Sequence, residues 1–90
     1  MDGGNAMKTL ERVTRESVGG RTMLYLSYQI GARVARTIEV AESGSVTIDV
    51  DAEGETIGIE LLAPGVVQLE ILTHIARERD LSLDGLFTYA

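Results

Sequence analysis

The chain has 90 residues, with eight Lys and Arg side chains against 14 Asp and Glu, which gives a formal net charge of −6. A chain of this length forms one small domain, and its negative charge disfavours binding to nucleic-acid phosphate or to an anionic membrane surface. The sequence contains no cysteine, which excludes disulfides, thiolate metal sites and thiol nucleophiles.

The first six residues are polar and rich in glycine, so we expect residues 1–6 to be a disordered lead and residues 7–90 to form a single domain. The amino terminus lacks a positively charged segment followed by an apolar run, and no apolar stretch reaches about 18 residues. We therefore expect a soluble, cytoplasmic protein that does not contact a membrane.

Strands are predicted for most of the first two thirds of the chain. Residues 8–15 carry two apolar residues among charges and fit an edge strand or a short helix, of which we favour the strand. Beyond them, apolar residues alternate with polar ones and glycines interrupt at short intervals, which is typical of consecutive antiparallel strands. This alternation predicts strands at about residues 22–30, 33–41, 45–51 and 55–62.

Two features of these strands bear on packing. Tyr25 and Tyr28 fall on opposite faces of one strand, so at least one of them points away from the core. Gly58 lies in the middle of the last predicted strand, where it indicates a bulge or the close approach of another backbone.

After Pro64-Gly65 the apolar period changes and predicts an amphipathic helix at about residues 66–79. The C-terminal tail, residues 80–90, is too apolar for a free end and should dock on the core or on another subunit, through Leu81, Leu83, Leu86 and Phe87. The predicted fold class is α+β: an antiparallel β-meander of four or five strands with one C-terminal helix packed on one face.

Residues 49–60 match most of a calcium-loop pattern, with Asp49, Asp51, Gly54 and Glu60 in register. An EF-hand needs a helix on each side of its loop, whereas this stretch begins in one predicted strand and ends in another. The segment Asp51-Ala52-Glu53-Gly54 instead fits a type I turn with a glycine bulge. We therefore predict a β-hairpin, and we keep Asp49, Asp51 and Glu60 as a candidate weak cation site.

No other motif indicates catalysis. His74, the only histidine, has Glu70 and Glu78 at four-residue spacing, which predicts a surface histidine in helix salt links. A Gly-rich phosphate loop, a G-x-S-x-G elbow and an H-E-x-x-H motif are all absent. Residues 75–86 are similar to part of a helix-turn-helix unit, but Asp84 and Gly85 oppose its contact with DNA. We expect no enzyme activity, no cofactor and no nucleic-acid partner.

Three segments carry a family resemblance: residues 22–28, residues 34–40, and residues 46–62 with the ending Gly58-Ile59-Glu60-Leu61-Leu62 after a D-x-D-x-x-G turn. Over roughly residues 8–63 the chain resembles the domain of unknown function 2283 family of small prokaryotic proteins. Residues 17–22 lack the acidic D-x-x-A-D turn of that family. The resemblance implies a compact β-meander without catalytic residues. Because some relatives look like partners of small toxin-like proteins, it also implies an antitoxin-like or regulatory role.

The favoured function is a non-catalytic protein-interaction or regulatory module, because edge strands and an apolar tail offer contact surfaces. Its partner would be another protein or a second copy of the chain, and a homodimer is the simplest form. The alternative is a weak cation- or small-ligand-binding protein that uses the acidic 49–60 hairpin.

Overall fold

A computed structural model describes residues 7–41 and 44–86 of the chain. The predicted disordered lead at residues 1–6 and the tail residue Phe87 lie outside these ranges.

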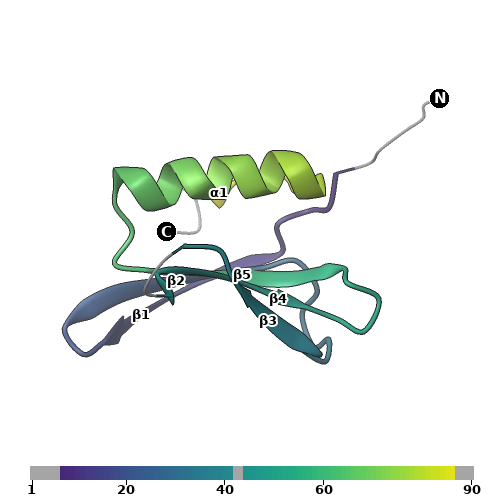
Figure 1. Cartoon of the computed structure of the whole chain (residues 1–90), viewed down its shortest axis with the longest axis horizontal. Helices are drawn as coiled ribbons and strands as arrows, with labels where there is room; N and C mark the ends of the chain where they lie inside the picture. Colours follow the sequence, from purple (N-terminus) through teal and green to yellow (C-terminus); the bar gives the residue numbers. More distant parts are fainter. Residues whose placement is uncertain (1–6, 42–43, 87–90) are drawn as a thin grey trace.

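In the described part of the chain, one antiparallel sheet of five strands is covered on one face by a single helix, α1 (Figure 1). The elements are β1 (Arg12–Val18), β2 (Arg21–Ser27), β3 (Arg36–Glu39), β4 (Val46–Val50), β5 (Thr56–Leu62) and α1 (Val66–Arg79). The predicted α+β class is confirmed, and α1 spans the same residues as the predicted helix.

The strand order is β1-β2-β5-β4-β3, which places β5 at the centre and β1 and β3 at the two edges. Strands β3, β4 and β5 form a meander. Strand β2 pairs with β5 instead of β3, with Tyr25 opposite Glu60 and Ser27 opposite Gly58. The connection from β2 to β3 therefore carries the chain from one half of the sheet to the opposite edge.

Strand β3 is shorter than the predicted range of 33–41. It pairs only with the five-residue β4, in a register that runs from Arg36 opposite Val50 to Glu39 opposite Thr47. Val34 and Val40 lie beyond the ladder and their side chains are exposed. Alternation of apolar residues continues past both ends of β3. The ladder stops where β4 ends at Val50, and at the other end the Val40 and Ala41 N–H groups both donate to the Val46 carbonyl.

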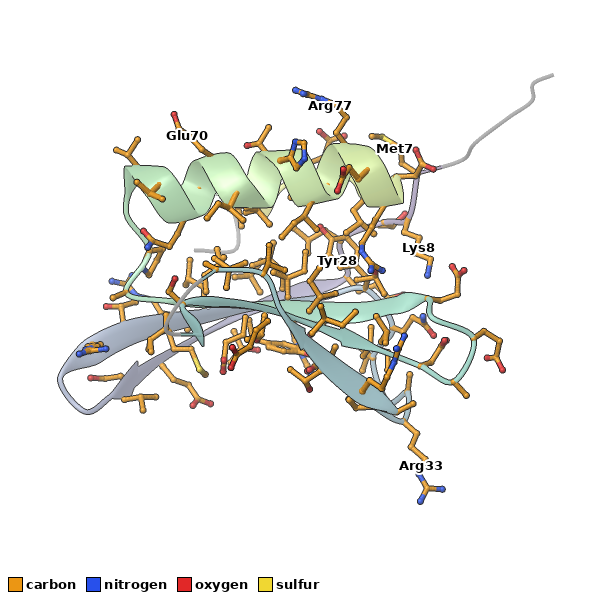
Figure 2. All side chains as sticks on the ribbon, in the orientation of Figure 1. Met7, Lys8, Tyr28, Arg33, Glu70 and Arg77 are labelled. Atoms are coloured by element: carbon orange, nitrogen blue, oxygen red, sulfur yellow. The ribbon has the colours of Figure 1, made fainter. Side chains whose placement is uncertain are left out.

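The core lies between α1 and the sheet. Figure 2 shows side chains filling this space, with Tyr28 among them, while Glu70 and Arg77 point away from the sheet. Buried residues come from the inner faces of the strands, from one side of the helix and from the segments before β1 and after α1: Leu10, Leu26, Val46, Val50, Ile59, Leu61, Leu72, Ile75, Leu81 and Leu86. The predicted docking of the tail on the core is confirmed for Leu81 and Leu86.

The segments before β1 and after α1 lie side by side. The Lys8 N–H donates to the Asp80 carbonyl and the Ser82 N–H donates to the Lys8 carbonyl, both over 2.9 Å. The buried Tyr28 hydroxyl donates to the Ser82 carbonyl over 2.8 Å, and burial raises the pKa of Tyr28 to about 12. This phenol is therefore a neutral donor at physiological pH, and it fixes the C-terminal segment to the core.

Candidate functional site

The face of the sheet opposite α1 carries a group of hydrogen-bonded polar side chains. Tyr25 Oη donates to Asp49 Oδ2 over 2.7 Å, and Thr37 Oγ1 donates to Asp49 Oδ1 over 2.6 Å. Thr47 Oγ1 donates to Glu60 Oε1 over 3.5 Å. We call these five residues the open-face cluster. Strands β2, β3, β4 and β5 each supply at least one member, so the sheet register brings together residues that are far apart in the sequence.

Gly58 makes room for the tyrosine of this cluster. A Cβ atom at Gly58 would lie within 3.0 Å of three atoms of the Tyr25 side chain, so the phenol ring rests directly against the glycine. The ladder between β4 and β5 also shifts register at Asp49 and Val50. The predicted irregularity at Gly58 is therefore present, but the group that approaches is a side chain rather than another backbone.

The environment of Tyr25 keeps its hydroxyl protonated. Burial raises the pKa of this phenol well above its ordinary value, and the hydrogen bond to Asp49 and the negative charges of Asp49 and Glu60 raise it further. A phenol held neutral in this way donates a hydrogen bond and does not supply a base or a nucleophile. The Tyr25 hydroxyl thus serves as a hydrogen-bond donor within the open-face cluster.

Asp51 has a separate role in the turn between β4 and β5. Its Oδ1 accepts from the N–H groups of Glu53 and Glu55 over 3.0 and 2.9 Å, and Oδ2 accepts from Gln29 Nε2 over 3.4 Å. The Gly54 N–H donates to the Asp51 carbonyl over 3.0 Å, and Gly54 has a φ of 83°. These contacts confirm the predicted type I turn with a glycine bulge. The Glu55 N–H is the main cause that lowers the pKa of the Asp51 carboxyl.

The three residues predicted as a cation site do not converge. Asp49 and Glu60 belong to the open-face cluster, whereas Asp51 is bonded to the backbone of its own turn. Within residues 7–41 and 44–86, no three or more His, Asp or Glu side chains form a group that could hold a metal ion. Both Asp49 oxygens already accept hydrogen bonds, so a cation there would compete with Tyr25 and Thr37.

His74 lies on the exposed side of α1, and its Nε2 is 3.3 Å from Glu78 Oε2, in agreement with the predicted surface contact. Among the described residues, no helix is long and apolar enough to cross a membrane.

Several shallow hollows open on the surface of the described residues, and two of them exceed about 300 Å³. One, of about 560 Å³, lies on the β1–β2 hairpin and the segment before α1, lined by Arg15, Gly20, Arg21, Thr22, Leu24, Ala63 and Pro64. The other, of about 390 Å³, lies between the β2–β3 connection and the β4–β5 turn, lined by Ala32, Arg33, Val34, Ala35, Asp51, Ala52 and Glu53. The lining residues of the first hollow include no histidine and no carboxylate. The second holds Asp51 and Glu53, of which Asp51 is bonded to the backbone of its own turn.

The outer edge of β1 is the longest unpaired stretch of strand in the described part of the chain. Strand β1 has seven residues and pairs with β2 alone, whereas β3 at the opposite edge has four. Gly19 and Gly20, with φ of 57° and 79°, close the β1–β2 hairpin as a two-residue turn. Residues that flank such a turn exchange both hydrogen bonds, and the pattern then alternates along the strand.

This alternation fixes which backbone groups of β1 face outward. Val18, Glu16 and Thr14 direct their N–H and C=O groups toward β2, so Val13, Arg15 and Ser17 direct theirs away from the sheet. The sequence indicated an edge strand near this position but not its length. Its partner strand and the turn at Gly19 and Gly20 determine that length, and the tight glycine pair is the local signal that could have located it.

No protein-family model matches the chain, and no curated protein or solved structure matches it at a significant level. The resemblance to the domain of unknown function 2283 family therefore stays a hypothesis that rests on the motif residues between 8 and 63.

Proposed function

We propose that this chain is a non-catalytic protein-interaction module that binds by accepting a partner's extended strand along the outer edge of β1. The observation that supports this proposal is the edge itself. It is seven residues long and has a partner strand on one side only. An exposed edge of this kind offers a row of unpaired N–H and C=O groups to another chain, and strand addition is a recurring mode of peptide recognition.

Strand β1 lacks most of the features that normally block such an edge. It contains no proline, and its pairing with β2 runs without a register shift from Arg12 to Val18. Its charged residues are of both signs: Arg12, Arg15 and Glu16. Mixed charge favours a partner strand with complementary charges over indiscriminate pairing, because like charges directly opposite each other are destabilising.

The polar side chains with the most distinctive environments support a role without catalysis. Tyr25 and Asp49 are bonded to each other, and Asp51 is bonded to its own turn. An antitoxin-like or regulatory role, which the family resemblance implies, is the more specific form of this proposal, because such proteins act by binding another protein.

Arg15→Pro tests the proposal. The Arg15 N–H points outward, so proline at this position removes a donor from the free edge while leaving the β1–β2 ladder in place. Val66→Pro is the matched control, because Val66 is the first residue of α1, is 74% exposed and occupies a position that tolerates proline. Both variants are first checked for an unchanged fold by NMR.

The two variants and the wild type are then used for affinity capture from an extract of the native cell. We expect a protein that the wild type and Val66→Pro both retain and that Arg15→Pro loses. The same set of retained proteins for all three would rule out β1 as the binding edge.

The second candidate function is small-ligand binding at the 49–60 hairpin, favoured by the hollow of about 390 Å³ next to Asp51. A fragment library screened by NMR tests it. Binding there should move the amide signals of residues 32–35 and 51–53 together, and no such response would remove this candidate.

A further inference from the structure

We propose that the strand added to β1 is the β1 strand of a second copy of this chain, paired antiparallel about a two-fold axis at Thr14. This inference rests on the proposed function, because it uses the same edge and names its occupant. In Figure 1, β1 lies at one margin of the sheet, and the chain before it turns away toward α1.

Symmetry limits the registers in which two copies of β1 can pair. A two-fold axis perpendicular to the sheet joins the two edges into one continuous antiparallel sheet and leaves both helices on the same side. Side chains that face each other must then lie on the same face of the sheet, so the axis has to pass through a residue and not between two. Because β1 spans seven residues, the registers that pair at least five of them centre on Thr14, Arg15 or Glu16.

Charge separates these three registers. An axis at Arg15 places the Arg15 side chains of the two copies opposite each other, and an axis at Glu16 does the same for Glu16. An axis at Thr14 places Arg12 opposite Glu16 of the other copy, and symmetry repeats this pair. Opposite charges and Thr–Thr pairs directly across strands are stabilising, whereas like charges are destabilising. The Thr14 register is therefore the complementary one.

The backbone agrees with this register. With the axis at Thr14, Val13 faces Arg15 of the other copy, and both residues direct their N–H and C=O groups outward from the hairpin. The hydrogen bonds between the two copies would thus use backbone N–H and C=O groups that have no strand partner within one copy. Thr14 stands opposite Tyr25 in the β1–β2 ladder, so the joined strands extend the sheet face that carries the open-face cluster.

Two charge reversals test the register. Arg12→Glu gives a β1 edge on which residues 12 and 16 are both acidic, and Glu16→Arg gives one on which both are basic. Alone, each variant opposes like charges across the two-fold axis. We expect the dissociation constant of its homodimer to rise by roughly tenfold or more, because two attractive pairs become repulsive. An equimolar mixture restores opposite charges at both pairs and should form a one-to-one heterodimer.

The mixture cannot associate through bulk charge. The wild-type net charge is −6, and each substitution changes it by two units, in opposite directions, so both variants stay negative. The matched control pair is Arg33→Glu and Glu53→Arg, which makes the same charge changes at exposed positions away from β1. These variants should dimerise like the wild type. Sedimentation equilibrium at low salt gives the dissociation constants, and native mass spectrometry identifies the heterodimer.

A second measurement reports on the backbone N–H groups at the outer edge of β1. Hydrogen exchange of the Val13 and Arg15 amides should slow as the wild-type concentration rises, while the exposed Val40 amide, which donates to the Val46 carbonyl within one copy, should be unaffected. A wild type that stays monomeric at millimolar concentration, or a mixture that associates no better than its components, would overturn the inference. Strand addition by a different protein is tested separately, by the affinity capture in which Arg15→Pro should lose a partner that the wild type retains.

Discussion

Replacing Gly58 with alanine tests how the open face of the sheet is packed. The added Cβ would lie within 3.0 Å of the Oη, Cζ and Cε2 atoms of Tyr25, a separation that packed atoms do not tolerate. The ring has to move away from β5, and this breaks its 2.7 Å hydrogen bond to Asp49. The substitution should therefore destabilise the fold although it adds only one methyl group.

The magnitude follows from three contributions. Overpacking costs about 1–3 kcal/mol, and loss of a hydrogen bond to a charged group costs about 1.5–3 kcal/mol. Alanine in a strand recovers about 0.5–1 kcal/mol relative to glycine. We expect Gly58→Ala to lower the free energy of unfolding by roughly 3 kcal/mol.

The control is the same substitution without the ring. In a Tyr25→Ala background the space above Gly58 is free, so Gly58→Ala should be neutral or stabilise the protein by about 0.5–1 kcal/mol. Urea unfolding of the wild type, the two single variants and the double variant gives the coupling energy between the two positions. An equal cost of Gly58→Ala in both backgrounds would show that the glycine is not there to accommodate Tyr25.

Three further predictions concern the turn, the tail and the acidic residues. Tyr28→Phe removes the hydroxyl that donates to the Ser82 carbonyl and should lower the free energy of unfolding by about 1 kcal/mol, as measured by urea unfolding, with faster hydrogen exchange in residues 81–86. Because the pKa of Asp51 is lowered in the folded state, its carboxylate stabilises the fold above its ordinary pKa and this stabilisation is lost as the pH falls through the folded value. The melting temperature of Asp51→Ala should thus be clearly below that of the wild type at pH 7, with a smaller gap at pH about 2; an unchanged gap would argue against the turn contacts. Millimolar calcium or magnesium should leave the amide signals of Asp49 and Glu60 in place, since both Asp49 oxygens already accept hydrogen bonds, and a selective shift of these signals would revive the cation site.

The apolar periodicity of the sequence correctly predicted the elements that pack on the core from end to end, such as α1 and β4. Helix α1 has Leu72 and Ile75 at helical spacing on its buried side, and β4 alternates with Val46, Ile48 and Val50 all buried. The fold class follows from these two patterns, because each needs an apolar surface to cover it.

The strand order and the ends of the edge strands could not be predicted in the same way. The pairing of Ser27 with Gly58 joins distant parts of the chain, and no local pattern distinguishes it from pairing of β2 with β3. Strand β3 begins at Arg36 because β4 ends at Val50, which the residues of β3 alone do not indicate.

For the candidate site too, the sequence predicted local features but not the contacts that depend on strand pairing. The sequence placed Tyr25 and Tyr28 on opposite faces of a strand and indicated that Gly58 had a special role. It did not indicate that the Tyr25 ring occupies the space at Gly58 and that Asp49 accepts from the hydroxyl, since both depend on the three-dimensional register. Acidic residues that looked like cation ligands are therefore found as acceptors for hydroxyl and backbone donors.

The pairing of the segment before β1 with the segment after α1 has a mechanical consequence. Lys8 and Leu81 form a parallel bridge, so tension applied on the N-terminal side of Lys8 and the C-terminal side of Leu81 pulls the two segments along each other in opposite directions. The two hydrogen bonds between them are then loaded together in shear, instead of opening one after the other as in an unzipping hairpin. Once Leu86 and Ser82 have come away from the core, a chain stretched from its two ends should resist at these two hydrogen bonds before the force reaches the β1–β2 ladder.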